Sequence, residues 1–169
     1  MKRIFLLFGL LIVLFSACTK TSYNTTKQAD IDEIKIQKYI AANHLTVTKD
    51  PSGIYYQILQ TSAGTIHPSV ADSDTVQVTY TGKLLNGGVF DSESVTLLPM
   101  SGLVKGFQTG MSLLTSNGAA PYARIMMIIP SNLAYGTTSL AAGNGVAVPA
   151  NSVLVFTVDL IGIVQGFGK

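Results

Sequence analysis

This chain of 169 residues has few of the side chains that carry covalent catalysis or metal binding. It contains a single cysteine, Cys18, so no disulfide can form within the chain. Its two histidines, His44 and His67, have no Cys, Asp or Glu at ligand spacing, which argues against a metal site. No nucleophile-elbow motif is present, which argues against Ser/His/Asp hydrolysis. The sequence therefore predicts neither a metal nor a cofactor.

Charged residues are also scarce, at 12% of the chain, and the formal net charge is only +2. No stripe of lysine and arginine appears anywhere in the sequence. A nucleic-acid partner would require such a stripe to neutralise phosphates, so this class of partner is excluded. The glycines around residues 143–145 belong to a long loop and do not form a phosphate-binding motif.

The N-terminus has the pattern of an export signal followed by a lipid attachment site. Lys2 and Arg3 precede an apolar run over residues 4–15, which is shorter than the roughly 20 residues that a membrane-spanning helix needs. Small residues then lead directly to Cys18, an order that resembles the cleavage site of bacterial lipoproteins. We therefore predict that residues 1–17 are a lipoprotein signal peptide and that Cys18 carries the lipid.

A plain secreted protein with an incidental cysteine is the alternative interpretation of this N-terminus. Because acyl chains contribute about 0.8 kcal/mol per buried methylene group, a multiply acylated cysteine would bind firmly to a membrane. We expect a protein of the bacterial cell envelope, lipid-anchored to the outer membrane on its periplasmic or surface face.

Between this segment and the main domain, residues 18–29 predict a flexible polar tether and residues 30–46 predict a helical extension. Asp32 and Glu33 are expected in the first turn of that helix, where carboxylates interact favourably with the helix dipole. The apolar side of the helix is expected to include Ile31, Ile34, Ile36, Tyr39 and Ile40. The helix would pack on the domain or space it from the membrane. A dimerising helix is the alternative, although about three turns make only a small interface.

Residues 50–166 predict the main domain, in which the apolar pattern has a period of two, typical of β-strands. Strands are expected around residues 54–59, 76–80, 124–129 and 153–163. No helix between them is long enough for repeated parallel crossovers, so antiparallel pairing is expected. One short helical pattern begins near Phe107. Together these elements predict an α+β fold, with a curved antiparallel β-sheet wrapped around one short α-helix.

The domain also contains a set of short segments in a characteristic order. They occupy residues 78–82, 88–92, 104–110, 129–136 and 148–156. Their sequences are VTYTG, GVFDS, VKGFQTG, IPSNLAYG and VPANSVLVF. In this order they resemble the FKBP-type peptidyl-prolyl cis/trans isomerases, and the resemblance covers nearly all of the domain.

The resemblance implies a pocket for an X-Pro unit and a role for each matching residue. The residues that match the catalytic set are Tyr80, Phe90, Asp91 and Tyr135. Those that match the substrate-binding set are Leu103, Val104, Phe107, Val148 and Phe156. In the family, the tyrosine that corresponds to Tyr135 donates a hydrogen bond from its hydroxyl to a substrate carbonyl. The residue that corresponds to Val104 donates one from its backbone N–H to a substrate carbonyl. Phe107 stands where the family usually has a tryptophan, a residue that this chain lacks.

Each of these residues also has a purely structural interpretation. Tyr80, Phe107 and Phe156 lie on apolar faces and would suit the core of most β-rich proteins. Asp91 could satisfy turn amides, and Tyr135 could close a loop. Their joint occurrence in one ordered set favours the pocket.

Two features of the family's pocket are missing from this sequence. No basic residue follows Asp91 to orient its carboxylate, because residues 92–96 read SESVT. Residues 95–98 are mostly aliphatic where family members carry an aromatic side chain. Loss of one aromatic wall would weaken binding by roughly 1–3 kcal/mol.

The expected function is therefore that of a peptidyl-prolyl isomerase that assists the folding of exported proteins. Rotation about an X-Pro bond is opposed by a barrier of ~18–20 kcal/mol. An apolar pocket that excludes water favours the twisted amide, whose carbonyl is less polar than that of the planar form. The expected partners are proline-containing polypeptides and, from the resemblance, rapamycin-type macrolides. A binding module or chaperone of the same fold with little turnover is the alternative.

Overall fold

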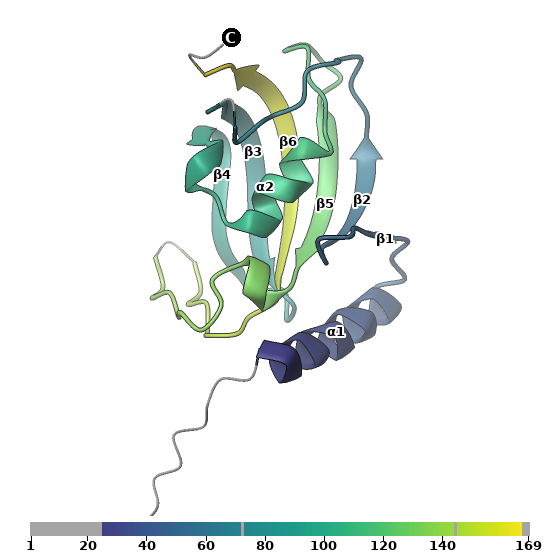
Figure 1. Ribbon diagram of the computed structural model, residues 1–169, viewed down its shortest axis with the longest axis vertical. Coiled ribbons are helices and arrows are strands. Elements are labelled where there is room, and N and C mark those ends of the chain that lie inside the picture. Colours follow the sequence, from purple (N-terminus) through teal and green to yellow (C-terminus); the bar gives the residue numbers. More distant parts are fainter. Residues whose placement is uncertain (1–24, 72, 144, 167–169) are drawn as a thin grey trace, which may run out of the picture.

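The computed structural model describes residues 25–71, 73–143 and 145–166 (Figure 1). Its elements, in chain order, are α1 (Thr25–Ala42), β1 (Thr48–Lys49), β2 (Tyr55–Gln60), β3 (Thr75–Leu84), β4 (Val89–Pro99), η1 (Met100–Gly102), α2 (Lys105–Ser112), β5 (Ala123–Ile129), η2 (Ser131–Leu133) and β6 (Leu154–Val164). The predicted signal peptide and the predicted lipid site, Cys18, lie outside the described residues.

The strands form one six-stranded sheet in the order β1-β2-β5-β6-β3-β4, and every neighbouring pair is antiparallel. The sheet curves around α2, which lies across its concave face (Figure 1). The hairpin between β3 and β4 turns at Gly87, whose φ of +89° is the left-handed conformation that glycine adopts without strain. This arrangement confirms the predicted α+β fold with a curved antiparallel sheet around a short helix.

Two glycines allow α2 to lie very close to β5. A Cβ added at Gly106 would stand 2.3 Å from Cγ2 of Ile129, and one added at Gly110 would stand 2.6 Å from the sulfur of Met127. The neighbouring Phe107 and Met111 are buried in the core between helix and sheet. Close contact at the glycines therefore fixes the position of Phe107 over the sheet.

The opposite face of the sheet carries a second apolar core, which α1 covers. Its buried members are Ile36, Tyr55, Met126, Ile128, Val153 and Val155. Where the two cores share them, β5 and β6 are therefore buried on both faces. Residues 125–129 are an unbroken apolar run, and such a run is the signal of a strand buried on both faces.

Helix α1 differs from its prediction in its start and in its buried side. It begins at Thr25, within the predicted tether, so Asp32 and Glu33 lie beyond its first turn. Ile31 and Ile34 are 45% and 69% exposed, whereas Ile36 is only 1% exposed. The helix thus packs on the sheet through one side, with two isoleucines left in solvent on the other.

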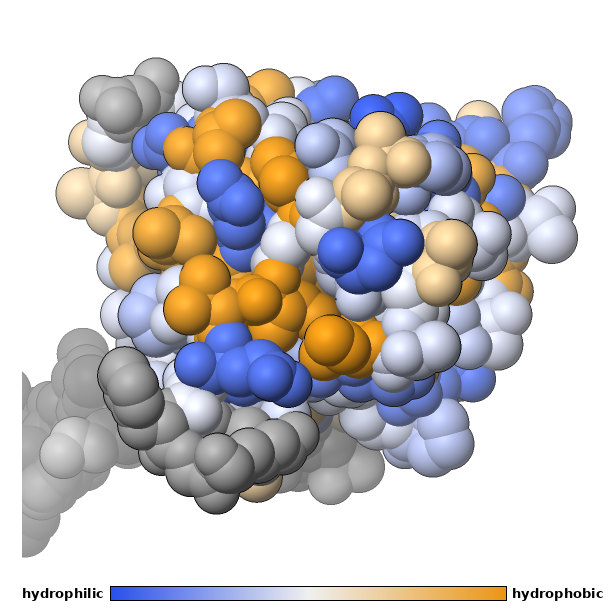
Figure 2. All heavy atoms as spheres, turned by 90° about the horizontal axis from the view of Figure 1, so that it is seen from above, coloured by the Kyte–Doolittle hydropathy of each residue, from blue (hydrophilic) through white to orange (hydrophobic). Residues whose placement is uncertain are grey.

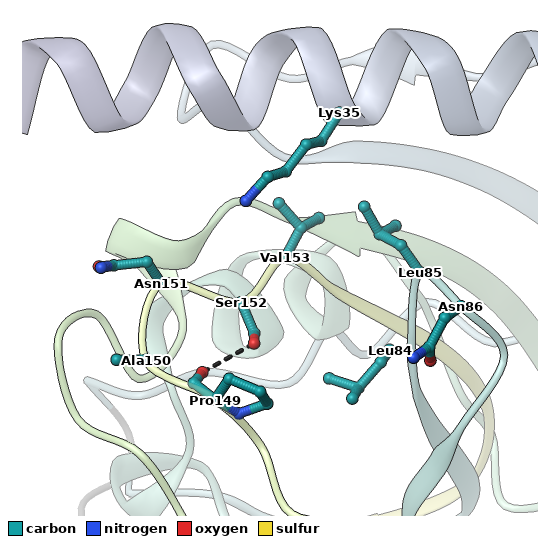
Figure 3. A pocket seen from close by; sticks show the side chains of 9 residues that line it. All are labelled: Lys35, Leu84, Leu85, Asn86, Pro149, Ala150, Asn151, Ser152 and Val153. Atoms are coloured by element: carbon teal, nitrogen blue, oxygen red, sulfur yellow. Dashed lines mark hydrogen bonds between the residues drawn. The ribbon is translucent and has the colours of Figure 1, made fainter.

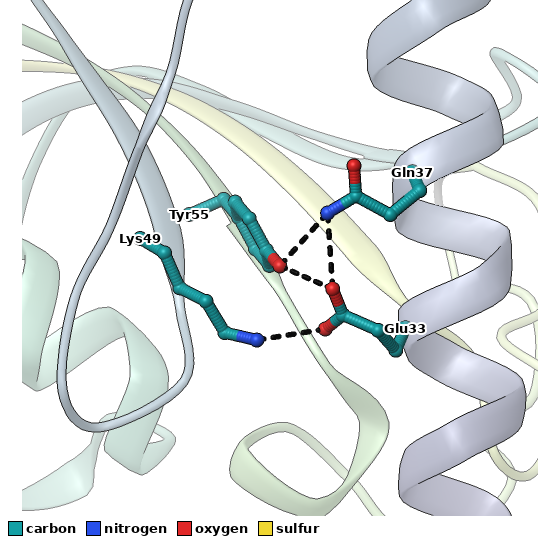
Figure 4. Close-up of polar contacts among 4 residues, drawn as sticks. All are labelled: Glu33, Gln37, Lys49 and Tyr55. Atoms are coloured by element: carbon teal, nitrogen blue, oxygen red, sulfur yellow. Dashed lines mark hydrogen bonds and ion pairs between the residues drawn. The ribbon is translucent and has the colours of Figure 1, made fainter.

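Polar contacts also join α1 to the sheet (Figure 4). The carboxylate of Glu33 accepts hydrogen bonds from the Tyr55 hydroxyl and from the Gln37 amide, and it pairs with the Lys49 ammonium at 3.0 Å. The hydrogen bond from Tyr55, followed by that from Lys49, lowers the pKa of Glu33. Because Tyr55 and Lys49 belong to β2 and β1, these contacts fix the helix to one edge of the sheet.

Apolar side chains are not confined to these two cores. Seen from above, the molecule has apolar residues gathered near the centre of the view, with hydrophilic ones between them (Figure 2).

No helix among the described residues combines the length and the apolar character that crossing a membrane requires.

Candidate functional site

A cavity of about 210 Å³ opens where α2, η1 and the segment after η2 meet the concave face of the sheet. Its lining residues are Tyr80, Asp91, Leu98, Gly102, Leu103, Val104, Phe107, Tyr135 and Phe156. Segments that are far apart in the sequence therefore meet at one place, which identifies this cavity as the candidate site.

Three aromatic rings from three different elements line the cavity in contact with one another, beside Leu98, Leu103 and Val104. Phe107 of α2 and Phe156 of β6 have ring centroids 5.0 Å apart with an interplanar angle of 87°. Tyr80 of β3 lies 6.3 Å from each of them, edge-on to Phe107 and tilted against Phe156. Edge-to-face contacts of this kind are favourable beyond the area that they bury. The rings therefore hold one another in place.

The polar part of the cavity consists of two tyrosine hydroxyls and one carboxylate. The Tyr80 hydroxyl donates a hydrogen bond of 2.7 Å to Oδ2 of Asp91. Burial, reinforced by this hydrogen bond, raises the pKa of Tyr80 well above its ordinary value. Burial and the charge of Asp91 also raise the pKa of Tyr135. Both hydroxyls therefore keep their protons at neutral pH, and the Tyr80 hydroxyl orients the Asp91 carboxylate.

The rim of the cavity is fixed from within α2. Val104 precedes the helix as its N-cap, and its carbonyl accepts the N–H groups of Phe107 and Gln108. The Gln108 side-chain amide donates to the carbonyls of Met100 at 3.0 Å and Leu103 at 2.8 Å. No hydrogen bond between described residues uses the backbone N–H of Val104, so this donor at the helix N-terminus remains available to a ligand.

Two residues that the family resemblance implies do not line the cavity. Phe90 is buried behind it, with its ring edge-on to Phe156 at 5.6 Å. Val148 is buried in the core, where its backbone pairs with that of Leu140. Each supports a lining residue or loop from behind, and their roles stay predictions.

Two lining residues, Leu98 and Gly102, were not among the predicted site residues. Leu98 belongs to the aliphatic segment that stands where the family carries an aromatic side chain. The wall of the cavity that Leu98 forms is therefore aliphatic, as expected from the sequence of residues 95–98. Gly102 is the last residue of η1, and it lines the cavity because of the course of the backbone through that turn.

A second cavity, of about 320 Å³, lies between α1 and residues 149–153 (Figure 3). Lys35 extends from the helix over it, and Leu84 and Leu85 of the β3–β4 hairpin form one side. It has no aromatic lining and no carboxylate. Within the part of the chain that the structure describes, no three His, Cys, Asp or Glu side chains cluster as a metal site would require. The aromatic cavity is thus better equipped to bind an apolar ring beside a polar backbone.

Comparison with known proteins identifies relatives of the chain. The model of a family described as FKBP-type peptidyl-prolyl cis-trans isomerase matches residues 67–161. A probable FKBP-type peptidyl-prolyl cis-trans isomerase from Haemophilus influenzae is 30% identical over 154 residues, which cover 89% of this chain and 58% of the relative. The corresponding protein FkpA from Escherichia coli K12 is 30% identical over 157 residues, covering 88% of this chain and 53% of FkpA.

The crystal structure of FkpA from Escherichia coli resembles this fold with a TM-score of 0.63 and 29% sequence identity. The similarity covers 83% of this chain and 62% of the FkpA chain. This chain thus spans little more than half the length of the two relatives that it matches in sequence.

Proposed function

We propose that this chain, which belongs to the family of FKBP-type peptidyl-prolyl cis-trans isomerases, accelerates the cis/trans isomerisation of X-Pro bonds in polypeptides. The observation that carries the proposal is the cavity with three aromatic rings, flanked by the Tyr135 hydroxyl and the Val104 backbone N–H. Its apolar part matches a proline ring, and its two donors match the flanking carbonyl groups.

The chemistry requires no proton transfer and no covalent intermediate. A planar X-Pro amide is polar and well solvated by water, whereas the twisted amide has lost its resonance and is less polar. The rings of Tyr80, Phe107 and Phe156 exclude water from the amide and so favour the twisted form relative to solution. Tyr135 and Val104 hold the backbone on either side, which restricts the motion to rotation about one bond.

Exchange between cis and trans forms of a short proline peptide tests this proposal, with purified protein that begins after Cys18. Removal of the Tyr135 hydroxyl in Tyr135→Phe and of the ring in Phe107→Ala should each lower kcat/KM by about five- to tenfold or more. Tyr122→Phe is the matched control, because Tyr122 lies outside the cavity and is 36% exposed. Equal rates for wild type and both cavity variants would refute the assignment of the cavity.

One observation favours a second candidate, a binding module with little turnover. Leu98 leaves one wall of the cavity aliphatic, so a bound proline would be held by fewer aromatic contacts. Titration of the same peptide into the protein separates the two candidates. The binding module would be favoured if wild type bound the peptide, Phe107→Ala did not, and wild type left the cis/trans exchange rate of the peptide the same as without protein.

We also propose that the protein acts on exported polypeptides from a lipid anchor at Cys18 in the bacterial cell envelope. The basic start, the apolar run and the small residues before Cys18 support this location. In cell fractionation, wild type should appear with membranes and Cys18→Ser in the soluble envelope fraction. Cys18→Ser protein that stays with the membranes would argue against the anchor. Rapamycin-type macrolides are proposed ligands of the cavity, which competition with the proline peptide would test.

A further inference from the structure

We propose that Asp32, on the N-terminal helix and outside the family's motifs, is a positioning residue for Tyr135. This inference rests on the proposed function, because it assigns a role toward the hydroxyl that would bind the substrate carbonyl. Asp32 is only 1% exposed although it is a carboxylate on a helix that otherwise lies along the surface. A carboxylate is buried at such a place only when hydrogen bonds compensate for the lost water.

The hydrogen bonds of Asp32 connect α1 to the segment that carries Tyr135. One carboxylate oxygen accepts a hydrogen bond of 2.7 Å from the Gln28 side-chain amide. The other accepts one of 2.8 Å from the backbone N–H of Ser131, the first residue of η2. Gln28 thus orients the carboxylate, and the second oxygen holds the start of the turn.

From Ser131 the connection continues through the backbone to both neighbours of Tyr135. The Ser131 carbonyl accepts the N–H groups of Ala134 at 3.1 Å and Gly136 at 2.8 Å. Gly136 has a φ of +58°, and its carbonyl in turn accepts the N–H of Asn151 at 2.7 Å. The backbone on both sides of Tyr135 therefore depends on the position of Ser131, which Asp32 fixes.

No other described group replaces Asp32 at this place. Ser131 is completely buried, and its hydroxyl oxygen already lacks a hydrogen-bond partner among the described residues. Without the carboxylate, its N–H would also be buried and unpaired unless the turn moved. Movement of the turn would carry the Tyr135 hydroxyl away from its position over the cavity.

Three variants of the chain from Thr19 onward test the proposal in the proline-peptide assay. Asp32→Ala should lower kcat/KM by about five- to tenfold, whereas Asp32→Asn, whose side-chain oxygen can still accept from Ser131, should retain most of it. Glu33→Ala is the matched control, because Glu33 joins the same helix to Tyr55 and Lys49 and none of its hydrogen bonds among the described residues goes to η2. An equal loss in Glu33→Ala would overturn the proposal, since docking of the helix would then be the cause.

Two further readouts separate positioning from a general effect on folding. In a Tyr135→Phe background, Asp32→Ala should cause little additional loss, because the hydroxyl that it positions is already absent. The same fold loss with and without Tyr135→Phe would overturn the proposal. Amide hydrogen exchange at Ser131, Ala134 and Gly136 should be faster in Asp32→Ala than in Glu33→Ala. This measurement tests whether Asp32 holds the backbone around Tyr135 even if the wild-type protein does not isomerise proline. A lack of isomerisation would refute the proposed function and leave the positioning role to be judged from hydrogen exchange.

Discussion

Tyr80 and Tyr135 differ in what their hydroxyl groups can do. Tyr80 donates to Asp91 within the protein, so its hydroxyl is already engaged and its ring serves the cavity. Tyr135 is partly buried, and no hydrogen bond between described residues uses its hydroxyl. Of the two, Tyr135 is therefore the one suited to donate to a ligand, while Tyr80 sets the orientation of the nearby carboxylate.

The raised pKa values of these tyrosines predict a specific response to alkaline pH. The isomerisation rate should stay constant as pH rises through 10.0, the ordinary tyrosine value, because the buried hydroxyls keep their protons. Stability should behave differently. The unfolded chain releases these protons from about pH 10 upward, so the stabilising contribution is complete below that pH and is lost above it.

Urea unfolding at several pH values around 10, alongside the rate assay, checks this prediction. Tyr80→Phe, which removes one of the groups, should lose less stability over the alkaline range than wild type does. A rate that falls with a midpoint at the ordinary tyrosine pKa would contradict it.

At this scale the motifs were informative because each site residue stands inside a short local pattern. Tyr80, Phe107 and Tyr135 could be selected from their neighbours in sequence, and the structure brings all three to one cavity. Asp32 could not, because its partner Ser131 is 99 positions away and no local pattern indicates the contact. Leu98 lines the cavity as an ordinary aliphatic strand residue, which only the folded register distinguishes from its neighbours.

Among the elements, α2 shows how closely the cavity depends on packing. The helix carries Phe107, and its distance from β5 is set by glycine at position 106, where a Cβ would stand 2.3 Å from Ile129. Gly106→Ala should therefore push the helix away from the sheet, lower the free energy of unfolding by about 1–3 kcal/mol and reduce isomerase activity.

Gly143→Ala is the matched control for that substitution, because nothing lies within 4 Å of the position of its added Cβ. Chemical denaturation compares the two variants, and the proline-peptide assay reports the effect on the cavity. Equal stability of Gly106→Ala and wild type would mean that α2 adjusts freely, contrary to the close contact with Ile129.

Helix α1 illustrates where sequence patterns reach their limit at the element scale. Residues 25–28 are polar and belong to the predicted tether, yet they are part of the helix. Local composition alone could not indicate this continuation, since part of its support is tertiary: Gln28 donates to Asp32, which in turn holds η2. The apolar residues of α1 were also too evenly spread to identify the buried side before the sheet was known.

The whole molecule has a sheet with an apolar core on each face, one under α2 and one under α1. Residues of β5 alternate between the two cores, with Ile125, Met127 and Ile129 on one side and Met126 and Ile128 on the other. Because both cores share these strands, α1 belongs to the folded unit. We expect the helix and the sheet to unfold together.

Paired substitutions on α1 test this joint unfolding. Ile36 is 1% exposed in the core under α1, and Ile36→Ala should lower the free energy of unfolding by about 2–4 kcal/mol. Ile34, on the same helix and 69% exposed, is the control, and Ile34→Ala should change it by less than about 0.5 kcal/mol. The cavity lies on the opposite face of the sheet, so a signal from a ligand in the cavity reports on a part of the molecule that α1 does not cover. If helix and sheet unfold together, far-ultraviolet circular dichroism and the fluorescence of that ligand should show one common transition in both variants. In the opposite outcome, Ile36→Ala would unfold α1 at a lower urea concentration while the cavity unfolded as in wild type. Helix α1 would then be an independent appendage. The contacts from Asp32 to Tyr135 could not, in that case, contribute to the stability of the site.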